Sequence, residues 1–278
     1  MLKSNVLRLV QLSDTHLLGE NGLLHGHINT WSRTVAAFSA AAHFNPDAVL
    51  ITGDIADRGQ NIHPSAARLF AQAQQDLQCP IITMPGNHDP AGSVGNEFNR
   101  ARLASGPFPG DTIHEVAGLR IISLDSHGFG KRAGWLTSEQ LQWLADLLTT
   151  AAPRGSVLAL HHPPIPSVLL AQAGRGLAEP ENLAAVLAGS DIRGIFCGHY
   201  HSSAVGALGA IPVWAAPAVS YNLNLFAPET HIQGLDTSWL SVITLDAENL
   251  SVTPVHINAP AASFSCEIRG LTREPAIA

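Results

Sequence analysis

The chain has 278 residues and a formal net charge of −7, with 13% charged and 46% hydrophobic residues. This composition excludes an intrinsically disordered chain, and an acidic balance without a basic run speaks against a nucleic-acid polymer as partner. The three cysteines are odd in number and far apart, so neither a disulfide framework nor a cysteine zinc site is indicated. No apolar run reaches transmembrane length and no signal-peptide pattern is seen, so we expect no membrane insertion and a cytoplasmic location.

Strand and helix patterns alternate through the first two thirds of the chain. In chain order the predicted elements are strand 6–12, helix 31–42, strand 48–52, helix 62–77, strand 80–83, helix 94–103, a hairpin over 112–116 and 119–124, helix 136–148, strand 156–160, helix 181–187 and strand 192–197. The helix at 136–148 is the clearest of the predicted helices, because Thr137 and Gln140 can form a capping box at its start.

After residue 200 the pattern changes to strands that are separated only by loops, at 211–215, 239–245 and 251–257. Alternating units followed by a run of strands predict an α/β fold built of layers with two sheets. We expect one domain over residues 1–257 and a C-terminal tail, 258–278, that packs on the surface or on a partner.

Polar clusters follow several of the predicted strands at the point where each strand ends. They are Asp14-Thr15-His16, Gly53-Asp54, Gly86-Asn87-His88-Asp89, His161-His162 and Gly198-His199-Tyr200-His201. In an open α/β sheet, ligands bind beyond the carboxyl ends of the strands, so these clusters are predicted to converge on one rim. Their carboxylate, imidazole and amide groups suit Mn, Fe or Zn.

Each cluster alone has a plainer interpretation. A Gly-Asp or Asp-x-His after a strand is most often a turn or a helix cap, and His-His-Pro-Pro can be a loop stiffened by proline. The Gly-His-x-His segment at 198–201 is more specific, because alternate positions of an extended segment share one face. The recurrence of such clusters at successive strand ends favours a metal site over separate turns.

The order of these motifs, over residues 8 to about 201, resembles the calcineurin-like metallophosphoesterase family. The segments GNHD, HHPP and GHYH are most similar to the branch that holds class III cyclic nucleotide phosphodiesterases and bacterial glycerophosphodiesterases. The resemblance implies a four-layer α-β-β-α sandwich of two mixed sheets flanked by helices. It also implies that the domain over residues 1–257 is a metal-dependent phosphoric diester hydrolase.

The resemblance further implies a binuclear centre of divalent or trivalent ions, drawn from Mn, Fe, Zn and Co. The implied ligands are Asp14, His16 and His201 for one ion, Asn87, His161 and His199 for the other, and Asp54 as the bridge. Two such ions clamp the attacking and leaving oxygens of an in-line displacement, and a hydroxide that bridges them attacks the phosphorus.

His88 is the implied catalytic residue. With Asn87 it would contact the phosphate of the substrate, and it would protonate the leaving alkoxide. The plainer alternative is a histidine that is hydrogen-bonded only to backbone. Asp89 would orient His88 or cap the next helix, Asp57 would lie behind the ligands or cap a helix, and His162 is expected to be structural.

A small phosphodiester, either a 3′,5′-cyclic nucleotide or a glycerophosphodiester, is the favoured substrate. The chain has GNHD where the protein phosphatases of the family have GNHE, and apart from Arg58 few arginines lie near the motifs. A phosphomonoesterase or protein phosphatase of the same fold and a non-catalytic metal-binding scaffold are the alternatives. Related glycerophosphodiesterases place a substrate histidine near the position of Tyr221. The tyrosine departs from that pattern, which disfavours a glycerophosphodiester and leaves room for a nucleotide whose base stacks on Tyr221 or Phe226.

Two further expectations concern segments outside the motifs. Residues 165–180 would form either a lid or a plain connection. The apolar late segment and the tail are compatible with a homodimer, although nothing in the sequence requires one.

Overall fold

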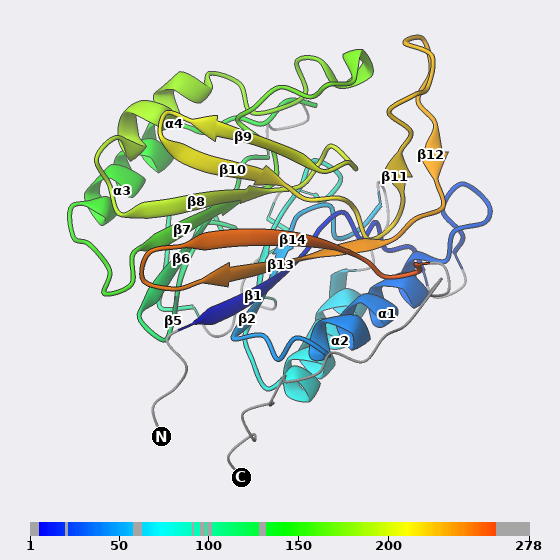
Figure 1. Ribbon diagram of the computed structural model, residues 1–278, viewed down its shortest axis with the longest axis horizontal. Helices are drawn as coiled ribbons and strands as arrows, with labels where there is room; N and C mark the ends of the chain where they lie inside the picture. Colours follow the sequence, from blue (N-terminus) through cyan, green and yellow to red (C-terminus); the bar gives the residue numbers. More distant parts are fainter. Residues whose placement is uncertain are drawn as a thin grey trace, which may run out of the picture.

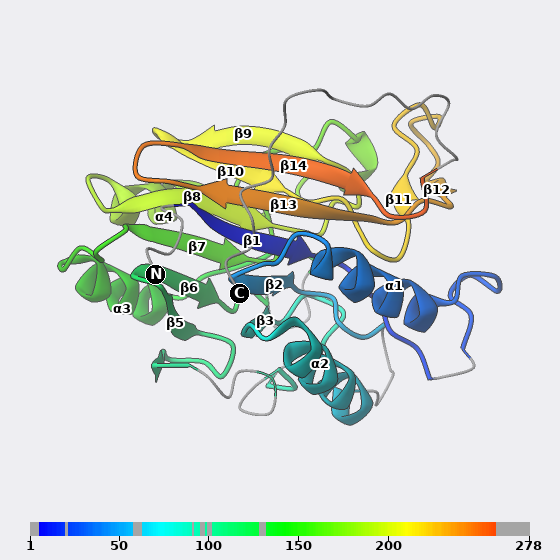
Figure 2. The same cartoon turned by 60° about the horizontal axis from the view of Figure 1, so that its bottom comes forward.

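Two β-sheets lie face to face in the middle of the molecule, and each carries helices on its outer side (Figures 1 and 2). The computed structural model describes residues 6–19, 22–57, 63–90, 92–94, 98, 102–127 and 132–259. No helix within these ranges has the length and apolarity needed to cross a bilayer.

The first sheet has the strand order β14-β13-β1-β2-β3, and helices α1 and α2 pack on it. Its elements are β1 (Leu7–Leu12), α1 (Thr30–Ala42), β2 (Ala48–Thr52), α2 (His63–Leu77), β3 (Ile81–Met84), β13 (Trp239–Leu245) and β14 (Leu250–His256). The strands β1, β2 and β3 are parallel, whereas β13 pairs antiparallel with β1 and with β14. The sheet is therefore mixed, with its parallel part next to the predicted ligand clusters.

The second sheet has the order β4-β5-β6-β7-β8-β10-β9, and helices α3 and α4 pack on it. Its elements are β4 (Ala104–Ser105), β5 (Thr112–Val116), β6 (Leu119–Leu124), α3 (Ser138–Leu148), β7 (Ser156–Leu160), α4 (Pro180–Leu187), β8 (Ile192–Cys197), β9 (Ala204–Leu208) and β10 (Ile211–Ala215). A short 3₁₀ helix, η1 (Leu170–Gln172), and a hairpin of β11 (Asn222–Leu223) and β12 (Gly234–Leu235) lie outside both sheets.

Each interface between layers is a separate apolar core. In β2, Val49 and Ile51 face Phe70 and the other α1 and α2 side chains, whereas Leu50 faces the second sheet. Alternate residues of a strand point to opposite faces, so a strand covered on both sides needs an unbroken apolar run. The run Ala48–Thr52 is fully buried for that reason. The predicted four-layer sandwich of two mixed sheets is confirmed.

The capping box of α3 is also confirmed, because Thr137 accepts from Gln140 N and Gln140 Oε1 accepts from Thr137 N. The prediction of a helix over 94–103 is wrong for its described part, since residues 94, 98, 102 and 103 are not helical. Strand β9 was not predicted, because its Ala-Val-Gly-Ala-Leu sequence has little β propensity and owes its place to pairing with β10. Most of the predicted tail, residues 260–278, lies outside the described residues.

Candidate metal centre

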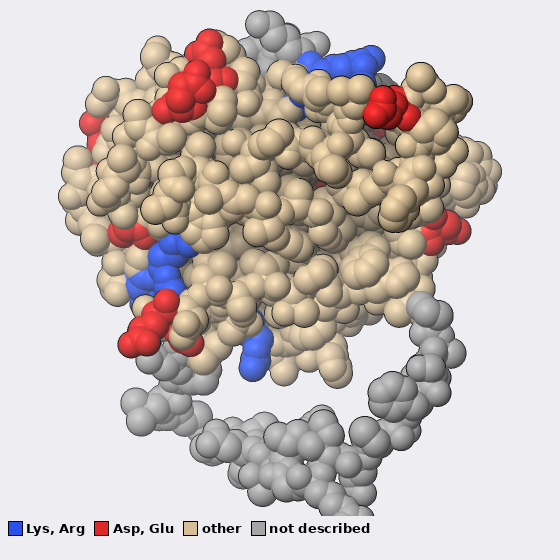
Figure 3. Space-filling model, turned by 45° about the horizontal axis from the view of Figure 1, so that its top comes forward, with Lys and Arg blue, Asp and Glu red and all other residues tan. Residues whose placement is uncertain are grey.

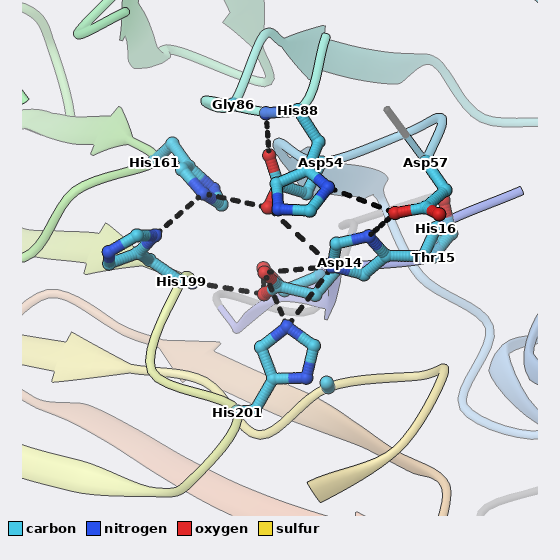
Figure 4. A network of polar contacts seen from close by, with 12 residues as sticks. Asp14, Thr15, His16, Asp54, Asp57, Gly86, His88, His161, His199 and His201 are labelled. Atoms are coloured by element: carbon cyan, nitrogen blue, oxygen red, sulfur yellow. Dashed lines mark hydrogen bonds and ion pairs between the residues drawn. The ribbon is translucent and has the colours of Figure 1, made fainter. Parts of the chain in front are cut away.

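The ends of β1, β2, β3, β7 and β8 meet at one edge of the sandwich, and the polar clusters that follow them come together there (Figure 4). Strands from both sheets contribute, since β7 and β8 belong to the second sheet and the other three to the first. The aspartates and histidines predicted as metal ligands come together in this region. Asn87, on the turn after β3, lines the cavity described below.

The backbone is strained where these side chains turn inward. Asp14, His16, Asp54, His199 and His201 all have positive φ angles, between 44° and 72°. This left-handed conformation costs roughly 1–2 kcal/mol for a residue with a side chain. Such strain persists only where the surrounding structure over-determines it, and it is concentrated at functional sites. The strained backbone at these five residues therefore indicates a functional site.

One group of ligand atoms consists of Asp14, His16 and His201, all buried. Nε2 of His201 lies 3.1 Å from Nε2 of His16 and 3.3 Å from Oδ1 of Asp14. Oδ1 of Asp14 is buried and has no hydrogen-bond partner among the described residues. One carboxylate oxygen and two imidazole nitrogens thus point toward one another. This is a set of ligand atoms that suits a transition-metal cation.

Asp54 connects this group to a second one. Its Oδ2 lies 3.5 Å from Nε2 of His16 and 3.4 Å from Nε2 of His161, and Nδ1 of His199 lies 3.2 Å from Nε2 of His161. The Nε2 atom of His199 and the Oδ1 atom of Asn87 are buried without a hydrogen-bond partner among the described residues. The Asp54 carboxylate thus lies between His16 on one side and His161 on the other.

Hydrogen bonds behind the ligands fix the imidazole tautomers. Nδ1 of His161 donates to the Thr52 carbonyl at 2.8 Å, and Nδ1 of His201 donates to the Tyr221 carbonyl at 2.8 Å. Each ring then presents Nε2 to the centre, which is the arrangement typical of histidines that bind metals. The hydroxyl of Ser13 and the backbone N–H of His199 hold the second oxygen of Asp14 at 2.6 and 3.0 Å.

The charges in the site are mutually balanced. Burial raises the pKa of Asp14, but His201 and then His161 outweigh burial and hold that pKa well below its usual value. Burial lowers the pKa of His161, but Asp54 and then Asp14 outweigh it and raise the pKa to about 9. A metal ion bound here would compete with protons for these groups, because metal ligands must be deprotonated.

The calcineurin-like phosphoesterase family profile matches residues 7–203, which include all of these clusters. The chain belongs to this family. It is 36% identical to a cAMP/cGMP dual specificity phosphodiesterase from Mycobacterium tuberculosis, over 82% of this chain and 72% of that protein. It is 31% identical to a glycerophosphodiester phosphodiesterase from Enterobacter lignolyticus, over 70% of each chain.

The fold is also similar to that of a dimetal phosphatase from Danio rerio. The TM-score is 0.61, with 90% of this chain and 96% of that chain covered at 13% identity. At such low identity the similarity shows a shared fold and nothing of the chemistry. The family membership and the orphaned carboxylate, imidazole and amide atoms together fit metal binding in this phosphoesterase.

His88 lies beside the ligands without being buried among them. Its Nδ1 is 3.0 Å from Oδ1 of Asp57, and its backbone N–H donates to Oδ1 of Asp54 at 2.8 Å. Its side chain keeps 26% of its surface exposed and contributes to the wall of the cavity. The alternative of a histidine bonded only to backbone is wrong, because Asp57 holds the ring.

Asp89 has a different place from the one expected. Its buried carboxylate accepts hydrogen bonds from the backbone N–H groups of Ile55, Ala56 and Gly86 at 2.9–3.0 Å, and His63 Nε2 lies at 3.0 Å. It therefore ties the loop after β2 to the turn after β3. The sequence signal for this role is its position in GNHD, but the partners are not evident from the sequence.

His162 is fully buried, with Nδ1 2.9 Å from the Ser126 hydroxyl. That contact agrees with the structural role expected for it. Its Nε2 has no partner among the described residues, and His161, His162 and His199 together form one of the groups that could hold a metal ion. The sequence places His162 in the same cluster as His161, but the implied ligand set did not include it.

A cavity of about 340 Å³ opens above the centre. Figure 3 shows the hollowed upper face of the molecule, on which charged side chains are sparse. The predicted site residues in the wall are His16, Asp54, Asn87, His88, His199, His201 and Tyr221, and the others are Arg132, Gln172, Arg175, Leu223 and Ile232. The ring of Tyr221 packs at 4.4 Å from that of His201.

Three polar residues of the wall were missed by the sequence prediction. Arg132 lies between β6 and α3, whereas Gln172, at the end of η1, and Arg175 lie between β7 and α4. No sequence motif marks any of the three. Few arginines stand near the motifs in the sequence, but folding brings Arg132 and Arg175 to the cavity wall. Arg58, the arginine that the sequence had suggested, lies outside the described residues.

Proposed function

We propose that this phosphoesterase is a binuclear-metal phosphodiesterase that hydrolyses small phosphodiesters, either a 3′,5′-cyclic nucleotide or a glycerophosphodiester. The observation that carries the proposal is the Asp54 carboxylate, which lies within 3.5 Å of ligand nitrogens on both sides at the floor of the cavity. Relatives that are 31–36% identical to the chain bear the names of a cyclic nucleotide phosphodiesterase and a glycerophosphodiester phosphodiesterase.

The proposed ligand sets share Asp54. They are Asp14, His16 and His201 on one side, and Asn87, His161 and His199 on the other. Imidazole, carboxylate and amide ligands accept Mn, Fe, Zn and Co alike, so the identity of the ions depends on their supply. Ions bound in this way supply Lewis-acid activation of water and of the phosphoester.

The residues of the chain supply binding and proton transfer. Asn87 and His88 lie together in the cavity wall, where the phosphate of a bound diester would contact both. Asp57 accepts from Nδ1 of His88 and so orients the ring. In the imidazolium form Nε2 also carries a proton, which His88 would give to the leaving alkoxide and so become neutral. No protein nucleophile is required for this reaction.

A phosphomonoesterase is the second candidate, and one observation favours it. Arg132 and Arg175 line the cavity, and guanidinium groups are suited to the dianion of a phosphomonoester. The relatives favour the diester, because both of those named above are phosphodiesterases.

A comparison of substrates tests the proposal. We would load the protein with manganese and measure kcat/KM for 3′,5′-cyclic AMP, glycerophosphoethanolamine and 4-nitrophenyl phosphate. One of the two diesters should exceed the monoester by orders of magnitude. Asn87→Ala should abolish that activity, whereas Asn182→Ala, on the exposed face of α4, should keep it. Turnover of the monoester alone would establish the second candidate.

A further inference from the structure

Strand β9 lies at the outer edge of the second sheet, and nothing among the described residues protects that edge (Figure 1). Natural proteins guard sheet edges with proline, charge, cover or very short strands, because a bare edge pairs with other chains. The other edge strands follow this rule. Strand β14 contains Pro254, β4 has only two residues, and in β3 the N–H of Ile81 donates to Gln74 Oε1 at 3.2 Å. The sequence of β9, Ala-Val-Gly-Ala-Leu, has neither a proline nor a charge.

The backbone of β9 offers hydrogen-bonding groups on its free side. Just after β10, Ala216 N donates to the last carbonyl of β8 at 2.8 Å, so Val213, three residues earlier, faces β9 instead. Val213 pairs there with Gly206. The N–H and C=O groups of the neighbours of Gly206, which are Val205 and Ala207, therefore point away from β10. Neither residue has a hydrogen-bond partner on that side among the described residues.

The surface around this edge is apolar. The side chain of Val205 is 76% exposed, and Ala207 is exposed as well. The segment that begins at Ile165 packs against the other face of β9, and it continues to Val168 and Leu170, which are 81% and 65% exposed. Exposed apolar residues that gather in one place are typical of an interaction site.

Charge indicates which partner fits. The chain has a net charge of −7, yet residues 202–228 contain no Lys, Arg, Asp or Glu. A strongly charged partner would find no complementary charge along β9, whereas two acidic copies of this chain repel each other least across an uncharged strip. An antiparallel pair of identical strands is also self-complementary, as the interface of a closed dimer must be.

We propose that two copies of the chain form a dimer by pairing β9 with β9, antiparallel, about a twofold axis at Gly206. Val205 of each copy then exchanges two backbone hydrogen bonds with the partner's Ala207, and the two second sheets become one continuous sheet. Pairing of such short strands buries less than the roughly 1,600 Å² of a standard interface, so Val168 and Leu170 are expected to add to it. No residue of β9 lines the cavity, so this inference is independent of the proposed function.

The mass of the protein in solution tests the proposal. In gel filtration with light scattering at micromolar concentration, the wild type should have twice the mass of the chain. Ala207→Pro removes an outward N–H that β10 does not use, and Val205→Lys adds a charge to the edge. Each should raise the Kd of the dimer about 30-fold or more, since the proline alone removes two symmetry-related hydrogen bonds. Val35→Lys, at an exposed position on α1, is the matched control and should keep the mass of the wild type.

A double variant, Val205→Cys with Ala207→Cys, tests the register. Its paired Cα atoms would lie about 5.5 Å apart, so mild oxidation should link the two copies by disulfides. Val35→Cys should not cross-link. Val205→Lys leaves the backbone of β9 unchanged, so it decides the matter if the proline variant folds poorly. A monomeric wild type, or a dimer that both β9 variants retain, would overturn the inference. A dimer whose double-cysteine variant stays unlinked would overturn the pairing about Gly206.

Discussion

His88 lies in the cavity wall with its ring held by Asp57, and we propose that it donates a proton to the leaving group. We expect His88→Ala to keep its bound metal while kcat for 3′,5′-cyclic AMP falls about 10²- to 10⁴-fold, the usual contribution of a general acid. With bis(4-nitrophenyl) phosphate the loss should be much smaller, because nitrophenolate leaves without a proton. Metal analysis and steady-state kinetics on the two substrates measure both effects.

An equal loss on both substrates would show that His88 binds the phosphate and donates no proton. Asp57→Asn tests the orientation of the ring in the same way. It should give a smaller loss with the same dependence on the leaving group, since the imidazole remains but its Nδ1 contact at 3.0 Å is weakened.

Asp89 stabilises the site through the backbone. Its carboxylate accepts hydrogen bonds from three backbone N–H groups. An asparagine in its place would point its NH₂ group at one or more of these N–H donors, and those hydrogen bonds would be lost. Asp89→Asn should lower the free energy of unfolding of the metal-free protein by about 2–4 kcal/mol, measured by urea denaturation. Asp76→Asn, at an exposed position on α2, should change it by less than about 0.5 kcal/mol. Similar values for the two variants would contradict the role assigned to Asp89.

At the scale of elements, the ends of β1 and β8 approach each other so closely that only glycine fits at position 198. A Cβ atom there would lie 1.9 Å from the Ser13 hydroxyl and 2.7 Å from Oδ2 of Asp14. Gly198→Ala must therefore displace Asp14, and we expect it to lose bound metal and activity together.

Gly19→Ala is the control for this variant, because a Cβ atom at Gly19 would meet nothing within 4 Å. It should retain the metal content of the wild type, measured by mass spectrometry of the dialysed protein. Full metal occupancy in Gly198→Ala would contradict the close packing of β1 against β8.

The strands that carry the clusters could be predicted from the sequence, because both of their faces are covered and their apolar runs are unbroken. Strand β2 was predicted with its observed bounds, and β1 and β3 within one residue at each end. Position at strand ends then brought Asp14, Asp54, His161 and their neighbours to one rim. Strand β9 and the two-residue strands of the β11–β12 hairpin have no such pattern, since only their partners define them.

The walls of the cavity could not be predicted in the same way. Arg132, Gln172 and Arg175 lie in segments without periodicity. Their approach to the centre depends on long-range hydrogen bonds, such as those that join Gly134 to Gly176 and the Tyr200 hydroxyl to the Ile165 carbonyl. The pairing of Asp57 with His88 and the backbone contacts of Asp89 likewise depend on the approach of the loops after β2 and β3. Local sequence specifies which groups are available, and tertiary packing decides which of them meet.

At the scale of the whole molecule, the net charge of −7 says little about the substrate cavity, where two arginines and proposed cations face the ligand. Single carboxyl groups that are shielded from solvent make the stability of the fold depend on pH. Burial raises the pKa of Asp125 to about 7, with Asp111 and Asp89 adding to the rise against a backbone hydrogen bond from His127. This pKa exceeds the ordinary value of an aspartate, so the folded state binds the extra proton between about pH 4 and 7.

The free energy of unfolding contributed by Asp125 is therefore fully present below about pH 4 and is lost as pH rises through 7. Asp125→Asn removes this dependence. In the metal-free protein we expect the variant to be more stable than the wild type by about 1–3 kcal/mol at pH 8 and equal to it at pH 4. Urea denaturation at the two pH values measures the difference. The same difference at both would contradict the role of ionisation.

The proposed binuclear centre is tested most directly by anomalous diffraction from crystals of the protein soaked in manganese. We predict two peaks about 3.5–4 Å apart, both in contact with the carboxylate of Asp54. One peak should lie among Asp14, His16 and His201, and the other among Asn87, His161 and His199. In Asn87→Ala the second peak should be lost or weakened. A single peak, or a peak held by His161, His162 and His199 without Asp54, would contradict the shared-carboxylate centre.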